Sequence, residues 1–298
     1  MLKVIGVQKI YGETKAVDHV DMHIKKDRCT ALIGPNGAGK TTLLSIITGL
    51  GKPDKGKVIL SGKHQDRREV LGYLPQFPRF YDWMTGREYV RYAGELFGLT
   101  RKEADRRAEE LLAMTGLEES GSKRIAGYSG GMKQRLGIAQ ALINRPELLI
   151  LDEPVSALDP FGRREVIELL KKLKKDTAIL FSTHVLGDAE QVSDDIYMMK
   201  EGRIILESTL AELKQNYALP VFLIETKDGI EELAEAFRNQ PWVKEVELEA
   251  GRIRIQAVNM EEGRAGVLQL LKDKNALYTK VEAETVSLED VFMQVMSG

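Results

Sequence analysis

Short apolar runs alternate along this chain with longer segments whose hydrophobic positions recur every three to four residues. The clearest apolar runs cover residues 29–33, 148–152 and 178–182, and each precedes a loop or the start of a helix. Helical periodicity, with charged residues on the opposite face, covers residues 102–114 and 163–174. Brief buried strands separated by amphipathic helices are typical of an α/β domain with a largely parallel sheet.

The middle of this region departs from the alternation of strands and helices. Between Trp83 and Asn144 the sequence has helical patterning and no convincing strand. We therefore expect a helical subdomain over about residues 83–145, inserted into an α/β domain that covers residues 1–218.

The pattern changes around residues 214–219, where a second domain is expected to begin. The remaining sequence predicts a strand, a helix, two strands, a helix and a strand, over residues 221–225, 230–237, 243–248, 252–256, 261–271 and 277–281. A last helix is predicted from Leu288 to Met296. The order βαββαβ indicates a small ferredoxin-like α+β domain over residues 219–298.

Charge is distributed unevenly between these two predicted domains. The 298 residues carry a formal net charge of −2, but residues 219–298 contain 9 Lys and Arg against 15 Asp and Glu. The second domain therefore has a net charge of −6 and the first +4, which argues against laying the second domain on DNA or anionic lipid.

Cysteine content and hydropathy indicate the cellular compartment in which the protein is expected. Cys29 is the only cysteine and lies in an apolar run, so we expect it to be reduced and buried. The N-terminal sequence has no pattern of a signal peptide, and no apolar run approaches the ~18–20 residues that a membrane span needs. We expect a soluble protein of the cytosol.

A glycine-rich segment follows the first apolar run and opens a helix. It fits the pattern G-x-x-x-x-G-K-[ST] and comprises Gly34, Pro35, Asn36, Gly37, Ala38, Gly39, Lys40 and Thr41, followed by Thr42. The glycines let backbone N–H groups surround phosphates, and the helix N-terminus adds partial positive charge. We expect Lys40 to reach the β- and γ-phosphate oxygens and Thr41 to offer its hydroxyl to Mg²⁺.

Two carboxylates end the apolar run at residues 148–152. The sequence reads Leu148-Leu-Ile-Leu-Asp-Glu-Pro154, which describes a core strand whose tip faces the phosphates. We expect Asp152 to hold Mg²⁺, through water, and Glu153 to act as the general base on the attacking water.

A third motif, Tyr128-Ser-Gly-Gly-Met132, lies between these two elements and starts a helix. With it, residues 1–212 resemble the ATP-binding-cassette ATPases, whose signature reads LSGGQ or close to it. The resemblance implies that two subunits enclose two ATP molecules, and that Ser129, Gly130 and Gly131 of one subunit approach the γ-phosphate held by the other. Tyr128 and Met132 depart from the usual leucine and glutamine; we expect activity to survive both changes.

The same resemblance assigns four further positions. Tyr11 corresponds to the aromatic residue that stacks on adenine, and Gln76 to the glutamine that contacts Mg²⁺ and the attacking water. Residues 156–159 correspond to a loop that crosses the dimer interface, and its last residue, Asp159, is expected near the nucleotide. His184, in Ser182-Thr-His184, corresponds to the switch histidine that contacts the γ-phosphate.

Other proteins with the phosphate-binding pattern fit less well. A GTP-binding protein would normally carry an N-K-x-D element, which this sequence lacks. A small-substrate kinase would require neither the Ser129-Gly-Gly131 motif nor a histidine after the second acidic strand.

What the ATPase drives is indicated by two further segments. An aromatic cluster at Phe77, Phe80, Tyr81 and Trp83 lies where transporters of this family receive a coupling helix of the permease, although core packing is an alternative interpretation. Residues 202–212 and 287–292 resemble the drug- and antibiotic-export subfamily, whose ATPases pair with separately encoded permeases. We therefore expect an exporter's ATP-binding subunit, acting as a dimer at the cytoplasmic membrane face.

Two other classes remain open at this point. One is a soluble ABC ATPase that acts on a nucleic-acid or ribosomal partner, which the acidic second domain and the single set of motifs disfavour. The other is a nucleotide-dependent sensing module with little turnover, which Glu153 and His184 disfavour.

Overall fold

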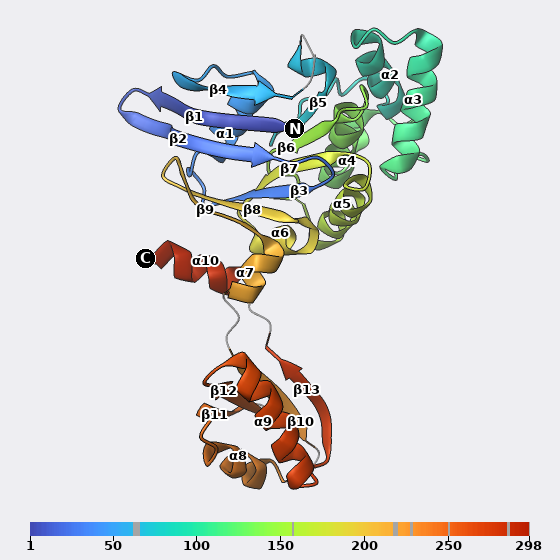
Figure 1. Ribbon diagram of the computed structural model, residues 1–298. Helices are drawn as coiled ribbons and strands as arrows, with labels where there is room; N and C mark the ends of the chain where they lie inside the picture. The colour runs from blue at the N-terminus through green and yellow to red at the C-terminus, as the bar shows by residue number, and fades with distance from the viewer. Residues whose placement is uncertain are drawn as a thin grey trace. The chain divides into compact units, whose positions relative to one another are not determined.

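The computed structural model describes residues 1–61, 66–156, 158–216, 220–226, 229–249, 251–284 and 287–297. The chain forms two units, Met1–Leu210 and Ala211–Gly298, which are described separately below (Figure 1). The predicted boundary between residues 218 and 219 falls on a segment outside the described residues.

A six-stranded sheet forms the centre of the first unit. Its strand order is β5 (Leu71–Leu74), β6 (Leu148–Leu151), β7 (Ala178–Thr183), β3 (Cys29–Ile33), β8 (Asp195–Lys200) and β9 (Arg203–Thr209). The first five strands are parallel and β9 is antiparallel to β8. Every residue of β3, β6 and β7 is buried, as the continuous apolar runs predict for strands covered on both faces. The three predicted strands are confirmed.

A second, antiparallel sheet was not expected from the sequence. It consists of β2 (Thr14–Ile24), β1 (Leu2–Tyr11) and β4 (Lys55–Leu60), with β1 in the centre. Inward side chains such as Leu2, Val4 and Ile24 join one core with residues of the parallel sheet. The pairing of β1 with β2 shifts register three times, so the apolar alternation that would indicate these strands is interrupted.

Helices cover the first unit. The α/β part contains α1 (Lys40–Thr48), α5 (Pro160–Leu173) and α6 (Leu186–Val192), and a short 3₁₀ turn at Arg67–Glu69. The predicted helical region holds α2 (Gly86–Leu96), α3 (Arg101–Met114), a 3₁₀ turn at Ile125–Gly127 and α4 (Gly130–Ala141) (Figure 1). All of residues 83–145 are described, and their one β-type pairing is a single bridge between Thr85 and Arg124. The helical character of this stretch is confirmed.

Two capping boxes start consecutive helices of that region. Thr85 and Glu88 cap each other's backbone at the start of α2, and Thr100 and Glu103 do the same for α3. Each pair satisfies N–H groups that the first helical turn leaves open. The N-terminal starts of these two helices are therefore fixed by local sequence.

The second unit begins with residues of α7 (Leu210–Asn216) and contains a four-stranded antiparallel sheet. Its strands are β10 (Val221–Thr226), β11 (Val243–Glu249), β12 (Arg252–Ala257) and β13 (Tyr278–Ala283), in the order β11-β12-β10-β13. Helices α8 (Ile230–Arg238) and α9 (Met260–Asp273) pack on one face, and α10 (Leu288–Ser297) ends the unit. The predicted βαββαβ order is confirmed, and with it the small α+β fold.

The open face of this sheet is charged. Arg254 of β12 pairs with Glu247 of β11 at 3.1 Å and with Glu284, just after β13, at 3.2 Å. Arg252 pairs with Glu225 of β10 at 2.9 Å. The arginines of the inner strand thus neutralise carboxylates on both sides.

No helix in the described part of the chain is both long enough and apolar enough to cross a bilayer.

The single cysteine provides a test of the first unit's core. Cys29 is fully buried, and burial raises the pKa of its thiol. Because the thiolate is the reactive form, we expect maleimide to label the native protein at pH 8 at least about a hundredfold more slowly than the protein in guanidinium chloride. Equal rates in the two states would contradict this placement.

Candidate nucleotide-binding site

The glycine-rich segment forms a loop between β3 and α1. Gly37 and Gly39 have φ values of 82° and 103°, in the left-handed region that favours glycine. A Cβ at Gly39 would collide with the carbonyl oxygen of Ala16. The loop therefore depends on glycine both for its turn and for its close approach to β2.

Lys40, the first residue of α1, is buried beneath this loop. Its Nζ donates to the carbonyl oxygens of Gly34 at 2.7 Å and Pro35 at 3.2 Å, and lies 3.3 Å from Oε1 of Glu153. The ammonium group thus joins the phosphate-binding loop to the end of β6. The loop and the acidic pair meet at one place, although over a hundred residues separate them in the sequence.

A cleft of about 540 Å³ lies above the loop. Its lining comes from five segments and comprises Thr14, Lys15, Ala16, Asn36, Gly37, Ala38, Gly39, Lys40, Thr41, Thr42, Gln76, Glu153, Glu201 and Gly202. Seven predicted residues of the loop segment, from Asn36 to Thr42, therefore share this cleft with Gln76 and Glu153. Gly34 and Pro35 do not line the cleft; their carbonyl oxygens accept hydrogen bonds from Lys40 instead.

The part of the lining formed by residues 14–16 and 201–202 is held by an ion pair. Arg203 donates two hydrogen bonds to Oδ2 of Asp18, at 2.9 and 2.7 Å, and this pairing lowers the pKa of Asp18 to about 2. Nearby, the N–H of Gly202 donates to the carbonyl of Ala38 at 3.0 Å. The β8–β9 turn is thus fastened both to β2 and to the phosphate-binding loop.

Asp152 and Glu153 follow β6 and are both buried. Ser182 of β7 donates its hydroxyl to Oδ1 of Asp152 at 2.6 Å and accepts the N–H of Glu153 at 2.9 Å. Glu153 has a φ of 49°, which is uncommon for a residue with a side chain. This strained turn directs consecutive carboxylates differently, one toward Ser182 and the other toward Lys40.

His184 lies directly beyond β7. Its Nδ1 is 2.6 Å from Oε2 of Glu153, so the two oxygens of that carboxylate contact Lys40 and His184 respectively. The structure therefore brings together three of the predicted functional side chains.

The Ser129–Gly131 motif is elsewhere on the same unit. Ser129 caps α4 by accepting the N–H of Met132 at 3.2 Å, and it does not line the 540 Å³ cleft. Ser129 and Gly130 are exposed, so their polar groups are open to a second molecule.

Tyr128, one of the two departures from the family's signature, has a packing role. Its ring is buried, and its hydroxyl donates to the carbonyl of Ser120 at 2.7 Å. A Cβ at Gly86 would collide with that hydroxyl, so the glycine at the start of α2 makes room for the tyrosine. Met132 is half-buried.

Two other predicted residues lie outside the cleft. Asp159 caps α5 by accepting the N–H of Gly162 at 2.7 Å; Ala157, in the preceding loop, is outside the described residues. Tyr11 is 57% exposed, with Nζ of Lys9 5.4 Å from its ring centroid. An exposed ring at the end of the β1–β2 hairpin is available for stacking, but the cleft does not include it.

The predicted Mg²⁺ ligands fit a hard cation in their chemistry. Oδ2 of Asp152 is buried and has no hydrogen-bond partner among the described residues, while Thr41 and Gln76 line the cleft, whose lining does not include Asp152. Oxygen donors of this kind suit Mg²⁺, which also takes phosphate oxygens and water. Among the described residues no group of three His, Cys, Asp or Glu side chains could hold a metal.

Ser182 is the residue that sequence reasoning missed as part of the site. It is a buried hydroxyl near the end of a strand that begins with four apolar residues, Ala178 to Phe181. A buried hydroxyl near the end of a strand needs a hydrogen-bond partner, which is expected at the carboxyl edge of the sheet. This is the signal by which the sequence could have indicated Ser182.

The fold and the loop together define a P-loop ATPase. Comparison with known proteins agrees. Residues 17–156 match the family model described as ABC transporter, and residues 209–296 match that of the ATP-binding protein DrrA1-3-like C-terminal domain.

Full-length relatives share both parts. The uncharacterized ABC transporter ATP-binding protein YxlF of Bacillus subtilis (strain 168) is 44% identical over 99% of each chain. The bacitracin transport ATP-binding protein BcrA of Bacillus licheniformis is 33% identical over 100% of this chain and 98% of its own. The linearmycin resistance ATP-binding protein LnrL of Bacillus subtilis (strain 168) is 31% identical, over 99% and 98%.

Among solved structures, the dimeric post-hydrolysis state of the ATP-binding cassette MJ0796 bound to ADP and Pi matches with a TM-score of 0.64. It is 31% identical and covers 70% of this chain and 99% of that one. The chain belongs to the ATP-binding proteins of ABC transporters and is an ATPase of that class.

The hydrogen bonds of Ser182 lead to a prediction. Ser182→Ala would leave the buried N–H of Glu153 without its acceptor, a loss of about 1–3 kcal/mol. We expect the turnover number for ATP to fall about tenfold or more with little change in KM, because the Glu153 carboxylate would lose its fixed orientation. Steady-state phosphate release measures both constants.

The matched control is Ser193→Ala, a buried serine whose hydroxyl bonds to the carbonyl of Ala189 away from the site. It should lower thermal stability without a comparable loss of turnover. If the two variants lose turnover equally, Ser182 has only a structural role.

Proposed function

We propose that this protein is the ATP-binding subunit of an exporter whose permease is a separate chain, and that two copies hydrolyse two Mg-ATP molecules between them. The observation that carries the proposal is the position of Glu153, between Lys40 of the phosphate-binding loop and His184. Full-length similarity to ATP-binding proteins of bacitracin transport and linearmycin resistance supports the exporter assignment.

We propose that the phosphate-binding loop and Lys40 bind the phosphates of ATP and that Tyr11 binds its adenine. The N–H groups of residues 36–42 bind the phosphates at the start of α1, where the helix dipole favours anions. Lys40 moves from its own loop carbonyls to the β- and γ-phosphate oxygens. Tyr11 stacks on adenine from the hairpin beyond the cleft.

Glu153 acts on the water that attacks the γ-phosphate. One oxygen of its carboxylate accepts the proton, and His184 holds the carboxylate in place and contacts the γ-phosphate. Thr41, Asp152 and Gln76 would hold Mg²⁺, which when bound neutralises charge that develops on the phosphates. Gln76, which lines the same cleft as Glu153, also orients the attacking water.

Closure by a second copy completes this site. Ser129, Gly130 and Gly131 lie outside their own chain's cleft, and the first two are exposed at the N-terminus of α4. We propose that they contact the γ-phosphate held by the second copy, with Asp159 beside them. The dimer of the MJ0796 cassette supports this arrangement by analogy.

The permease is proposed to dock on the aromatic cluster after β5. Phe80 packs edge to face on Tyr89, with ring centroids 5.1 Å apart, so it belongs mainly to the core. Phe77 and Trp83 are 69% and 70% exposed and offer the apolar surface that a helix of a partner could bury. Through the permease, the protein would be peripheral to the cytoplasmic membrane face.

Glu153→Gln tests the general base. We expect turnover to fall by about 10²–10⁴-fold, because the amide cannot accept the proton of the attacking water, while ATP still binds. Phosphate release and equilibrium binding of a fluorescent ATP analogue measure the two effects. Glu119→Gln, an exposed carboxylate on the helical part, is the control for lost charge; wild-type turnover in Glu153→Gln would contradict the assignment.

Capture of the partner tests the transporter assignment. Tagged Glu153→Gln protein, incubated with Mg-ATP and solubilised native membranes, should retain a protein with several membrane spans, identified by mass spectrometry. Adding Phe77→Ala and Trp83→Ala should lower that recovery about tenfold, because the exposed rings would be hot spots of the interface.

The control is Tyr278→Ala, an exposed ring on the second unit, which should leave recovery unchanged. Recovery of ribosomal proteins or nucleic acid, without a membrane protein, would instead support the soluble class and overturn the exporter proposal.

A further inference from the structure

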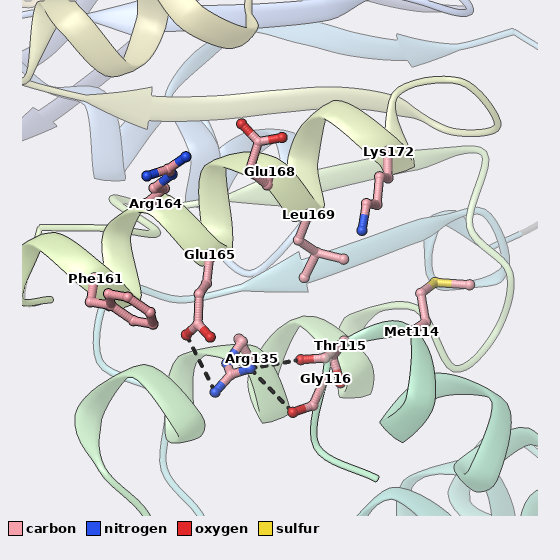
Figure 2. Close-up of a pocket in the computed structure, with 10 residues that line it drawn as sticks. All are labelled: Met114, Thr115, Gly116, Arg135, Phe161, Arg164, Glu165, Glu168, Leu169 and Lys172. Atoms are coloured by element: carbon pink, nitrogen blue, oxygen red, sulfur yellow. Dashed lines mark hydrogen bonds and ion pairs between the residues drawn. The ribbon is translucent and has the colours of Figure 1, made fainter.

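A groove of about 370 Å³ lies between the end of α3 and α5, and Arg135 of α4 also lines it. Figure 2 shows Phe161, Glu165 and Leu169 of α5 along one side and Met114 to Gly116 along the other. Arg135 of α4 lies between them, with its guanidinium group directed to both sides (Figure 2). This one side chain of α4 therefore contacts both the turn after α3 and α5.

The contacts of Arg135 are specific. Its Nη1 donates to the carbonyl oxygens of Thr115 at 3.3 Å and Gly116 at 3.2 Å, and its Nη2 lies 3.5 Å from Oε2 of Glu165. The side chain is only 15% exposed. Gly116 has a φ of +67°, and a Cβ there would lie 2.9 Å from Nη1, so the turn after α3 is shaped around the guanidinium.

The helices that Arg135 and Glu165 join both begin at predicted nucleotide-facing residues. Ser129 caps α4 six residues before Arg135, and Asp159 caps α5 six residues before Glu165. At ~1.5 Å per residue, the ion pair lies about 9 Å along each helix from its cap. It is therefore close enough to orient the caps and too far to contact the nucleotide.

The first turns of α4 and α5 also lie close together, at a glycine of each helix. A Cβ at Gly131 would lie 3.7 Å from the Cα of Gly162, so the starts of α4 and α5 pack backbone to backbone. A contact without side chains sets the distance between two helices but leaves their angle to other contacts. The bonds of Arg135 provide a second fixed point, and two points define the angle.

We propose that Arg135 is a positioning residue that fixes the angle between α4 and α5, and thereby holds Ser129–Gly131 and Asp159 in the arrangement that binds the nucleotide of a second copy. This inference rests on the proposed closure of two copies around ATP. It requires no contact between Arg135 and the nucleotide. Arg135 should accordingly affect dimer closure and leave the chain's own nucleotide cleft unchanged.

The test uses the full chain in the Glu153→Gln background with Mg-ATP. Sedimentation velocity gives the dimer dissociation constant, and a fluorescent ATP analogue gives nucleotide affinity at protein concentrations where the chain is monomeric. We expect Arg135→Gln to raise the dimer dissociation constant about tenfold, the effect of losing bonds from a charged donor, with nucleotide affinity within about twofold of the parent. Arg135→Lys, which keeps a cation and can bond one carbonyl, should recover part of the loss.

Two further variants keep the test decisive. Glu165→Gln removes only the ion pair at a partly exposed position and should raise the dissociation constant about threefold even if Arg135→Gln folds poorly. Arg164→Gln is the matched control, because Arg164 lines the same groove but points away from Arg135 (Figure 2). It should leave dimerisation unchanged.

The outcomes separate the two proposals. If the parent stays monomeric with Mg-ATP, both the closure and the role of Arg135 are overturned. If the parent dimerises and Arg135→Gln dimerises equally well, only the role of Arg135 is overturned. Parallel losses of dimerisation and nucleotide affinity would show a merely structural residue and would also overturn it.

Discussion

The nucleotide site depends on the adjacency of three parallel strands, β6, β7 and β3, whose carboxyl ends meet at one edge of the sheet. Each strand delivers one part at this edge: the phosphate-binding loop after β3, the acidic pair after β6 and His184 after β7. In parallel sheets ligands bind at such edges, since loops from several strands converge there. The parts lie about 30 to 150 residues apart in the sequence and become neighbours only through this pairing.

A single carboxylate then connects the three parts. Glu153 contacts Lys40 through one oxygen and His184 through the other, while its N–H bonds to Ser182. Buried charges are tolerated only when they are paired and hydrogen-bonded, and here Glu153 follows β6 while its partners lie in or after the other two strands, β3 and β7. The residue proposed to take the proton therefore has all its partners only when the three strands are paired as they are here.

Much of this could be predicted from the sequence because local pattern specifies it. The fully buried strands, the capped helices and the phosphate-binding loop each have a local signal, such as the unbroken apolar run of β3 or the Thr85 and Glu88 pair. The sheet formed by β1, β2 and β4 could not be predicted in the same way, because its irregular register breaks the alternation. Ser182 and Arg135 act through tertiary contacts with residues about 20 to 30 positions away, and no local pattern indicates such partners.

The charged open face of the second unit has a consequence for assembly. Its edge strands are β11 and β13: β11 carries Glu245, Glu247 and Glu249, whereas Glu282 of β13 pairs with Lys280 of the same strand at 2.6 Å. Natural sheets use charge on edge strands to prevent added pairing. In β11 the three glutamates outnumber the single lysine. Two copies meeting along β11 would therefore bring mainly like charges together, and the repulsion disfavours a fifth strand at this edge.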